Sequence, residues 1–239
     1  MKRIVSTLFL SILITTLGMS QIQKSVFQTG EEELEIWHIG HGSLMLQYKG
    51  KVIHIDPFST LTDYTTLPKA DLILITHEHA DHLDPKAIET IRKEGTDFIL
   101  TSVCYETVME GQVIANGENT SWNGIQIEAV PAYNIVHKRP DGKFYHPKGI
   151  GNGYVLTVKN LKVYVAGDTE DIPEMKNLKN IDVAFLPMNL PYTMTPEMTA
   201  NAARMFRPKV LYPYHYGNTD TNKLVELLKD DTAIDVRIR

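Results

Sequence analysis

The feature that most constrains this chain is a dense cluster of ionisable side chains directly after an apolar run. Residues 72–75 read Leu-Ile-Leu-Ile, and residues 76–84 read Thr-His-Glu-His-Ala-Asp-His-Leu-Asp. The apolar run is typical of a buried strand, so the cluster is expected to begin at a strand end. There His77 and His79 would point the same way, because side chains alternate along a strand with period two.

This cluster predicts a metal site. Imidazole nitrogens and carboxylate oxygens are ligands that divalent zinc and related ions accept. His77 and His79 would bind one ion, while Asp81 and His82, which follow as the chain turns, would bind a second. A solvated polar loop is the alternative, but His-x-His-x-Asp-His is an improbable chance spacing in a chain with nine His among 239 residues. Asp81 is also the predicted catalytic residue, since its carboxylate can accept a proton from the attacking water.

Two further ligands are predicted where later apolar runs end. Asp168 follows residues 163–166, and its two carboxylate oxygens are suited to bridging two cations. His215 follows residues 210–214 in the same way. Considered separately, Asp168 would form an Asx turn and His215 would be a packed core residue. Beside the cluster, we interpret both as metal ligands.

The last predicted ligand is His146, which precedes glycines at positions 149, 151 and 153 that allow a close backbone approach. His137, flanked by Lys138 and Arg139, is expected to be solvated. His41 lies in a Gly-His-Gly-Ser segment. His41 is expected to orient a metal ligand or to contact the substrate, rather than to bind a metal itself.

The N-terminus has the composition of a secretory signal peptide. A charged start precedes a mostly apolar stretch and small residues suited to cleavage. We therefore predict a signal peptide over residues 1–20 and one mature domain over residues 21–239, in the periplasm or secreted, without stable membrane association. Without Lys2 and Arg3 the formal charge of −5 becomes −7, which argues against nucleic acid as a partner.

Short strands alternate with helices along the mature domain. Strands are predicted over residues 34–39, 43–48, 52–55, 72–76, 98–101, 125–130, 154–158, 163–166, 183–186 and 210–212. Helices are predicted after Asp84 and Thr195, each a capping residue followed by proline, and over residues 222–228. Residues 21–32 are expected to be a loose leader and residues 234–238 an edge strand. This order predicts an α/β domain in which sheets pack together with helices outside.

With the cluster, Asp168 and His215 assembled, the chain resembles the metallo-β-lactamase-fold superfamily of metal-dependent hydrolases over residues 33–217. The segments Ile55-Asp56-Pro57 and Gly167-Asp168-Thr169 belong to the same resemblance. It implies a four-layer αββα sandwich with two divalent metal ions at one edge between the sheets. It also implies that Asp56 orients a ligand His through a hydrogen bond.

A finer resemblance is to the L-ascorbate-6-phosphate lactonase-like branch. The segments that carry it begin at Pro131, His146, Ala166, Leu186 and Tyr212. Most of the superfamily places a His soon after the strand that here ends at Asn134, and Asn is a poor zinc ligand. Either His146 supplies the missing imidazole, or one ion is held more weakly and the site is mononuclear or favours manganese.

The predicted function is that of an exported hydrolase that uses metal-activated water on a small ester, lactone or phosphoester. A divalent ion lowers the pKa of bound water to about 7; zinc is expected, with manganese or iron as alternatives. Tyr133, Lys148, Tyr192 and Tyr214 are candidates to bind the oxygens of a small-molecule substrate. The alternatives are a β-lactamase, a nuclease, which the acidic charge disfavours, and a non-catalytic metal-binding protein.

Overall fold

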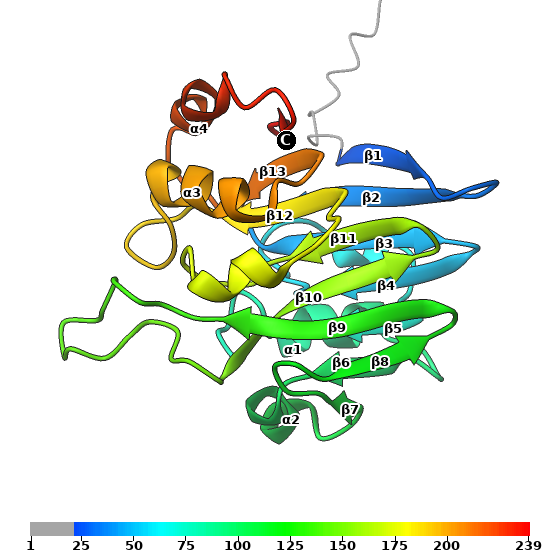
Figure 1. Ribbon diagram of the computed structural model, residues 1–239. Helices are drawn as coiled ribbons and strands as arrows, with labels where there is room; N and C mark the ends of the chain where they lie inside the picture. The colour runs from blue at the N-terminus through cyan, green and yellow to red at the C-terminus, as the bar shows by residue number, and fades with distance from the viewer. Residues whose placement is uncertain (1–21) are drawn as a thin grey trace, which may run out of the picture.

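The computed structural model describes residues 22–239 and contains two seven-stranded sheets (Figure 1). The predicted signal peptide lies outside these residues. The first sheet has the order β1-β2-β3-β4-β5-β6-β7. Its strands are β1 Gln23–Gln28, β2 Glu33–Gly40, β3 Ser43–Tyr48, β4 Lys51–Ile55, β5 Leu72–Leu74, β6 Asp97–Leu100 and β7 Gln112–Val113.

The second sheet has the order β14-β13-β12-β11-β10-β9-β8. Its strands are β8 Asn119–Trp122, β9 Ile125–Ala132, β10 Gly151–Val158, β11 Leu161–Val165, β12 Val183–Pro187, β13 Val210–Tyr214 and β14 Asp235–Val236. The helices are α1 Pro85–Ile91, α2 Ser102–Val108, α3 Pro196–Phe206 and α4 Thr221–Leu228, with 3₁₀ helices η1 Tyr64–Thr66 and η2 Pro173–Asn177. None of these helices has both the length and the apolar character needed to cross a bilayer.

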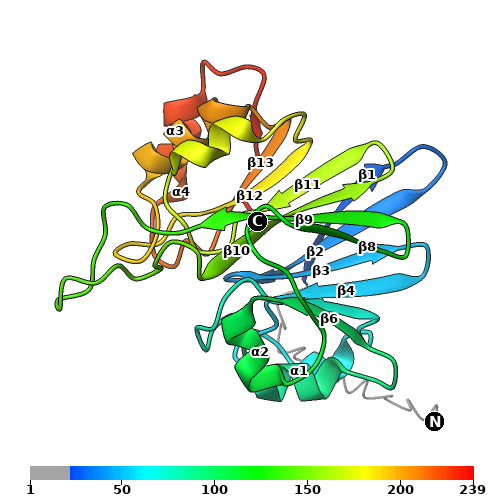
Figure 2. The ribbon, with the colours of Figure 1, turned by 60° about the horizontal axis from the view of Figure 1, so that its bottom comes forward.

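The sheets and helices form four layers, which Figure 2 shows from the side. The inner faces of the two sheets bury one core, to which Leu46, Leu74 and Phe185 contribute. A second core lies between the second sheet and α3 and α4, and a third lies between the first sheet and α1 and α2. Central strands are therefore apolar on both faces, as β12 is throughout. The predicted αββα sandwich is confirmed.

Capping residues explain where the helices begin. Asp84 precedes α1, and its side chain accepts a hydrogen bond from the backbone N–H of Lys86. Thr195 precedes α3, and its side chain accepts a hydrogen bond from the backbone N–H of Met198. Helix α2 was not predicted, although Thr101 caps it in a similar way. It spans seven residues and buries only Cys104, so its sequence has little helical periodicity.

Strand β1 shows that residues 23–28 are not part of a loose leader, which was expected over residues 21–32. β1 pairs with β2 in antiparallel fashion over its whole length. Phe27 packs against the core between the sheets, and Ser25 Oγ lies 2.9 Å from Tyr212 Oη of the second sheet. The strand was hard to predict because an edge strand with one solvated face keeps many polar residues.

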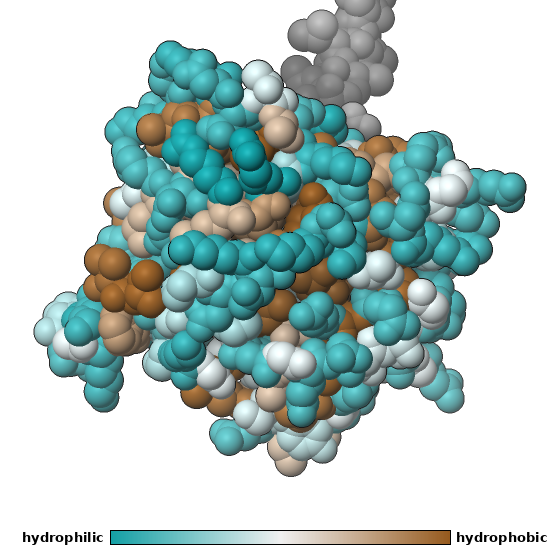
Figure 3. Space-filling view, viewed as in Figure 1, coloured by the Kyte–Doolittle hydropathy of each residue, from teal (hydrophilic) through white to brown (hydrophobic). Residues whose placement is uncertain are grey.

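The parallel strands place several loops at one edge of the molecule. β4 pairs with β5 in parallel, and β11, β12 and β13 are parallel neighbours. Parallel neighbours present their carboxyl ends at the same edge. The residues that follow these five ends are Asp56, His77, Asp168, Asn189 and His215. Figure 3 shows hydrophobic residues gathered at the left of the molecule, where the loops after β9 and β12 lie in Figure 1.

Candidate metal centre

The His-rich segment lies in a loop, because β5 ends at Leu74 and does not continue to Thr76 as predicted. The second sheet holds this loop, since Asn152 N donates to Thr76 O at 2.9 Å. His77 Nε2 and His79 Nδ1 nevertheless converge and are 3.2 Å apart. Their convergence follows from the conformation of the loop rather than from the alternation of side chains along a strand.

Four side chains from the two sheets form the first donor group. They are His77, His79, His146 and Asp168. His146 Nε2 lies 3.2 Å from His79 Nδ1 and 3.2 Å from Asp168 Oδ2, and His77 Nε2 lies 3.9 Å from the same carboxylate oxygen. Three imidazole nitrogens and one carboxylate oxygen around a common centre match the donor types and number of a tetrahedral zinc site.

The second donor group consists of His41, Asp81, His82 and His215. Asp81 Oδ2 lies 2.8 Å from His41 Nε2 and 3.3 Å from His215 Nε2. His82 Nε2 lies 3.5 Å from Asp168 Oδ1. Asp168 therefore lies between the two groups: Oδ2 is near His146 of the first and, at 3.6 Å, near His215 of the second, while Oδ1 is near His82. His41, which was predicted to have a supporting role, lies among the donors of this group.

Two buried polar atoms of this centre have no hydrogen-bond partner within residues 22–239. They are His82 Nε2 and Asp168 Oδ1. The other ring nitrogen of His82, Nδ1, lies 2.8 Å from Asp56 Oδ2, which keeps the imidazole oriented. Buried polar atoms without partners are unfavourable unless a ligand satisfies them. The donor atoms therefore fit a divalent cation.

The charges of the centre depend strongly on one another. Burial lowers the pKa of His77 well below 6.5 and also lowers the pKa of His79, so both imidazoles offer a lone pair at neutral pH. Burial would raise the pKa of Asp168, but the neighbouring imidazoles hold it well below its usual value. Burial would lower the pKa of His82, but Asp168 and Asp56 raise it to about 9. A cation that binds His82 therefore displaces a proton.

Close backbone packing at Gly42 supports the second donor group. A Cβ at this position would lie 2.7 Å from His82 Cε1, so any other residue would displace the imidazole. His41 and His215 have φ angles of 48° and 47°, and His215 N donates to His41 O at 2.9 Å. Residues other than glycine are uncommon in this left-handed region and are concentrated at functional sites.

A buried network that the sequence did not predict positions His146. Asn134 Oδ1 accepts from the His146 backbone N–H at 2.7 Å and lies 2.8 Å from His146 Nδ1. Asn134 Nδ2 donates to Glu170 Oε1 at 2.9 Å, and the fully buried Glu170 carboxylate also accepts from the backbone N–H groups of residues 135–137. Asn134 therefore orients His146, whose Nε2 faces the first donor group. The only sequence signal for Glu170 is its position two residues after Asp168.

Glu170→Gln is expected to weaken metal binding by up to roughly 10-fold, the lower end of the effect of removing a group bonded to a ligand His, because Glu170 acts on His146 through Asn134. A glutamine offers one acceptor oxygen where the carboxylate offers two, so the segment that carries Asn134 loses bonds. Competition with a chromogenic chelator measures the affinity, and thermal melting measures stability. Glu174→Gln is the matched control, because Glu174 contacts Tyr133 and Lys148 outside the donor groups. Equal metal affinities for the two variants would contradict the role of Glu170.

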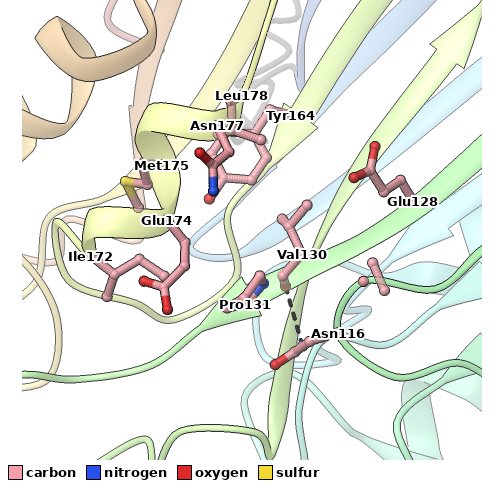
Figure 4. Close-up of a pocket in the computed structure, with 12 residues that line it drawn as sticks. Asn116, Glu128, Val130, Pro131, Tyr164, Ile172, Glu174, Met175, Asn177 and Leu178 are labelled. Carbon is pink, nitrogen blue, oxygen red and sulfur yellow. Dashed lines mark hydrogen bonds between the residues drawn. The ribbon is translucent and has the colours of Figure 1, made fainter.

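Tyr133 and Lys148 do not face the metal centre, which corrects their predicted role in substrate binding. Lys148 Nζ donates to Glu174 Oε1 at 2.7 Å, and Tyr133 Oη donates to Glu174 Oε2 at 2.9 Å. Glu174 lines a separate pocket of about 270 Å³ on the outer face of the second sheet, between β9, β11 and η2 (Figure 4). This pocket is largely apolar, with Tyr164 and Met175 in its wall, and contains none of the donor residues.

The pocket at the metal centre has a volume of about 430 Å³. Its lining residues outside the donor groups are Ala80, Arg139, Tyr145, Asn189 and Tyr192. Tyr192 was predicted, whereas Arg139 and Tyr145 reach the pocket on the long loop after β9, whose course no sequence pattern indicated. Tyr214 is buried, and burial raises its phenol pKa well above the usual value. It lines a neighbouring pocket with His41 and His215, and its role in substrate binding stays a prediction. His137 lies outside both donor groups, with Nδ1 2.7 Å from Glu170 Oε1.

Comparison with known proteins gives a consistent result. The family described as Beta-lactamase superfamily domain matches residues 25–215. A UPF0173 metal-dependent hydrolase of Thermococcus onnurineus is 31% identical over 198 residues, covering 77% of this chain and 84% of that protein. A crystal structure from Parabacteroides distasonis has 54% identity and a TM-score of 0.88, and the match covers 92% of this chain and 99% of that chain. Igni18, a metallo hydrolase from Ignicoccus hospitalis, has 27% identity and a TM-score of 0.72, with 86% and 94% covered.

Proposed function

The chain belongs to the UPF0173 family of metal-dependent hydrolases, within the metallo-β-lactamase superfamily, and from this premise we propose that it cleaves small esters, lactones or phosphoesters outside the cytoplasm. The observation that carries the proposal is Asp168, whose buried carboxylate faces both donor groups. This arrangement supports two divalent ions. Zinc is the first candidate because imidazoles outnumber carboxylates among the donors, and manganese and iron accept the same ligand types.

The residues of the chain orient and ionise the groups that react. Asp81 lines the pocket. Burial would raise the pKa of its carboxyl group, but hydrogen bonds with His215 and His41 hold that pKa well below the usual value. Asp81 is therefore ionised at neutral pH, as a metal ligand must be. Its proposed role as proton acceptor rests on its position in the pocket and not on this pKa, because a low pKa makes a carboxylate a weak base. Hydrogen bonds behind His82 and His146 keep those donors in place. Bound divalent ions supply activation of the water and stabilise the charge that develops on the attacked group.

The pocket volume of about 430 Å³ suits a small molecule. Lactones are the first substrates to test, because the segments beginning at His146 and Tyr212 resemble the lactonase-like branch. Export is proposed from residues 1–20, where a charged start precedes an apolar stretch.

Protein that begins at residue 21, loaded separately with zinc, manganese or iron, tests the proposed substrates. We expect about two ions per chain by elemental analysis, and metal-dependent turnover of at least one chromogenic ester, lactone or phosphoester. A chromogenic cephalosporin in the same panel tests the β-lactamase alternative. Two bound ions without turnover of any ester, lactone or phosphoester would contradict the proposal. Fractionation of bacteria that express the full chain tests export, and an uncleaved chain found only in the cytoplasm would contradict that part.

A further inference from the structure

We propose that Arg139, Tyr145 and Tyr192 select substrates in which an anionic group lies beside an apolar or aromatic group; this inference rests on the proposed function of the same site. The three side chains line the pocket at the metal centre, and none of them belongs to a donor group. They are therefore available to determine which molecule is bound, while the donor groups determine the reaction.

The loop that carries Arg139 has a fixed base and a short hairpin at its tip. Arg139 N donates to Lys143 O at 2.7 Å, and Gly142 N donates to Arg139 O at 2.9 Å. At the base, Glu170 accepts the backbone N–H groups of residues 135–137. Figure 1 shows this loop projecting from the ends of β9 and β10, beside the loop after β12. An anchored loop holds a recognition side chain near the site with little loss of entropy on binding.

Arg139 pairs with no acidic residue in the part of the chain that the structure describes. Its Nη2 donates to His79 Nε2 at 3.1 Å and to Tyr145 O at 3.3 Å, and no carboxylate within residues 22–239 forms an ion pair with it. A guanidinium at the mouth of a pocket without a carboxylate partner is suited to bind an anionic group of a ligand, because its planar donors match carboxylate and phosphate oxygens.

Metal binding would release Arg139 from His79. His79 Nδ1 is the atom that faces the first donor group. A neutral imidazole that gives the lone pair of Nδ1 to a cation carries its proton on Nε2. His79 Nε2–H and Arg139 Nη2–H are then both donors and cannot bond to each other. In the loaded protein the guanidinium is therefore free to turn toward an anion in the pocket.

The same part of the pocket presents aromatic and aliphatic surface. The Arg139 guanidinium lies over the Tyr145 ring at 5.2 Å, and the Tyr145 and Tyr192 rings meet edge to face with centroids 5.0 Å apart. Tyr192 is 44% exposed, and the nearby loop residues Val136 and Leu190 are 62% and 44% exposed. Hydrophobic residues gather on the surface at these loops (Figure 3). Exposed aromatic and aliphatic groups beside a pocket typically contact an apolar part of a ligand.

The charge of the loaded centre favours the same substrate class. Asp81 and Asp168 are the carboxylates of the two donor groups, and Asp56 lies behind His82; together they neutralise only part of the charge of two divalent ions. Arg139 adds a further positive charge at the mouth of the pocket. Opposite charge at short range favours an anionic substrate over a neutral one. The expected substrates are therefore small anionic esters, lactones or phosphoesters with an aryl or alkyl substituent.

Binding of three probes to the zinc-loaded protein tests this inference by calorimetry, independently of turnover. Benzylphosphonate has an anion and a ring, methylphosphonate has the anion alone, and benzyl alcohol has the ring alone. We expect the affinity for benzylphosphonate to be at least about tenfold higher than the affinity for methylphosphonate or for benzyl alcohol. Arg139→Gln is expected to weaken both phosphonates about tenfold, whereas Lys138→Gln, a neighbouring cation that lies over Phe144, is expected to leave them unchanged.

The aromatic contact has its own variant and control. Tyr192→Ala is expected to remove most of the difference in affinity between benzylphosphonate and methylphosphonate. Tyr105→Ala, at an exposed tyrosine of α2, is expected to leave this difference unchanged. Unchanged phosphonate affinities in Arg139→Gln, or an unchanged difference between the two phosphonates in Tyr192→Ala, would overturn the inference even if the panel of esters is hydrolysed. The expected affinity differences without hydrolysis of any panel compound would support the inference and contradict the proposed function.

Discussion

Asp168→Ala is expected to lower metal-dependent hydrolysis by about a thousandfold or more, the largest effect of any single substitution in this chain. The Asp168 carboxylate lies 3.2 Å from His146 and 3.5 Å from His82, one residue from each donor group. Its removal therefore weakens both groups at once. Elemental analysis after dialysis is expected to find less than half of the metal that the unaltered protein retains.

Asp168→Asn provides a second variant with nearly the same shape. It removes the negative charge while preserving the packing. Loss of metal and of activity in this variant would therefore result from the lost metal ligand and not from misfolding. Asp141→Ala is the matched control, since Asp141 is an exposed acidic residue on the loop after β9, and it is expected to retain metal and activity. Full metal content and activity in a folded Asp168→Asn protein would exclude Asp168 as a shared ligand.

His146→Ala has the second largest expected effect, and this effect is confined to the first donor group. His146 Nε2 lies within 3.2 Å of both His79 Nδ1 and Asp168 Oδ2, so its loss leaves three of the four donors there. We expect affinity for one ion to fall by about a hundredfold or more, because even the loss of a group behind a ligand weakens binding 10- to 100-fold. The second donor group remains complete, so one ion per chain is expected to stay bound.

Titration of the metal-free variant with zinc against a chelator gives the two affinities separately. Lys138→Ala is the control, because Lys138 lies on the same loop, over the Phe144 ring, and belongs to neither donor group. It is expected to bind both ions with the affinity of the unaltered protein. Two tightly bound ions in His146→Ala would show that another residue completes the first site.

Most of the fold was predictable because the two sheets have apolar strands with short connections. The strands of the second sheet that are buried on both faces, such as β12 and β13, appear in the sequence as uninterrupted apolar runs. Strand β1 and helix α2 were missed for the opposite reason. β1 buries only one residue fully, and α2 has one buried residue in seven, so neither carries a clear period.

The candidate site divides in a similar way. The positions of His77, His79, Asp81 and His82 were predictable because they lie within six consecutive residues, and Asp168 and His215 because each follows an apolar strand. Tyr133 and Lys148 were predicted to bind the substrate, but the sequence does not indicate the direction of a side chain. Both face Glu174 on the outer side of the second sheet.

The sequence by itself determined the chemical type of the site, because spacing between neighbouring residues and the ends of apolar runs are local properties. Only the tertiary structure decided which donors meet. His146 joins the first donor group because Asn134 and the buried Glu170 hold its loop, and His41 joins the second because it contacts Asp81, 40 residues away in sequence. Such contacts depend on how the two sheets pack against each other and on where long loops are anchored, which no local pattern encodes. Arg139, which lines the pocket from the tip of such a loop, is for that reason a residue that only the folded structure identifies.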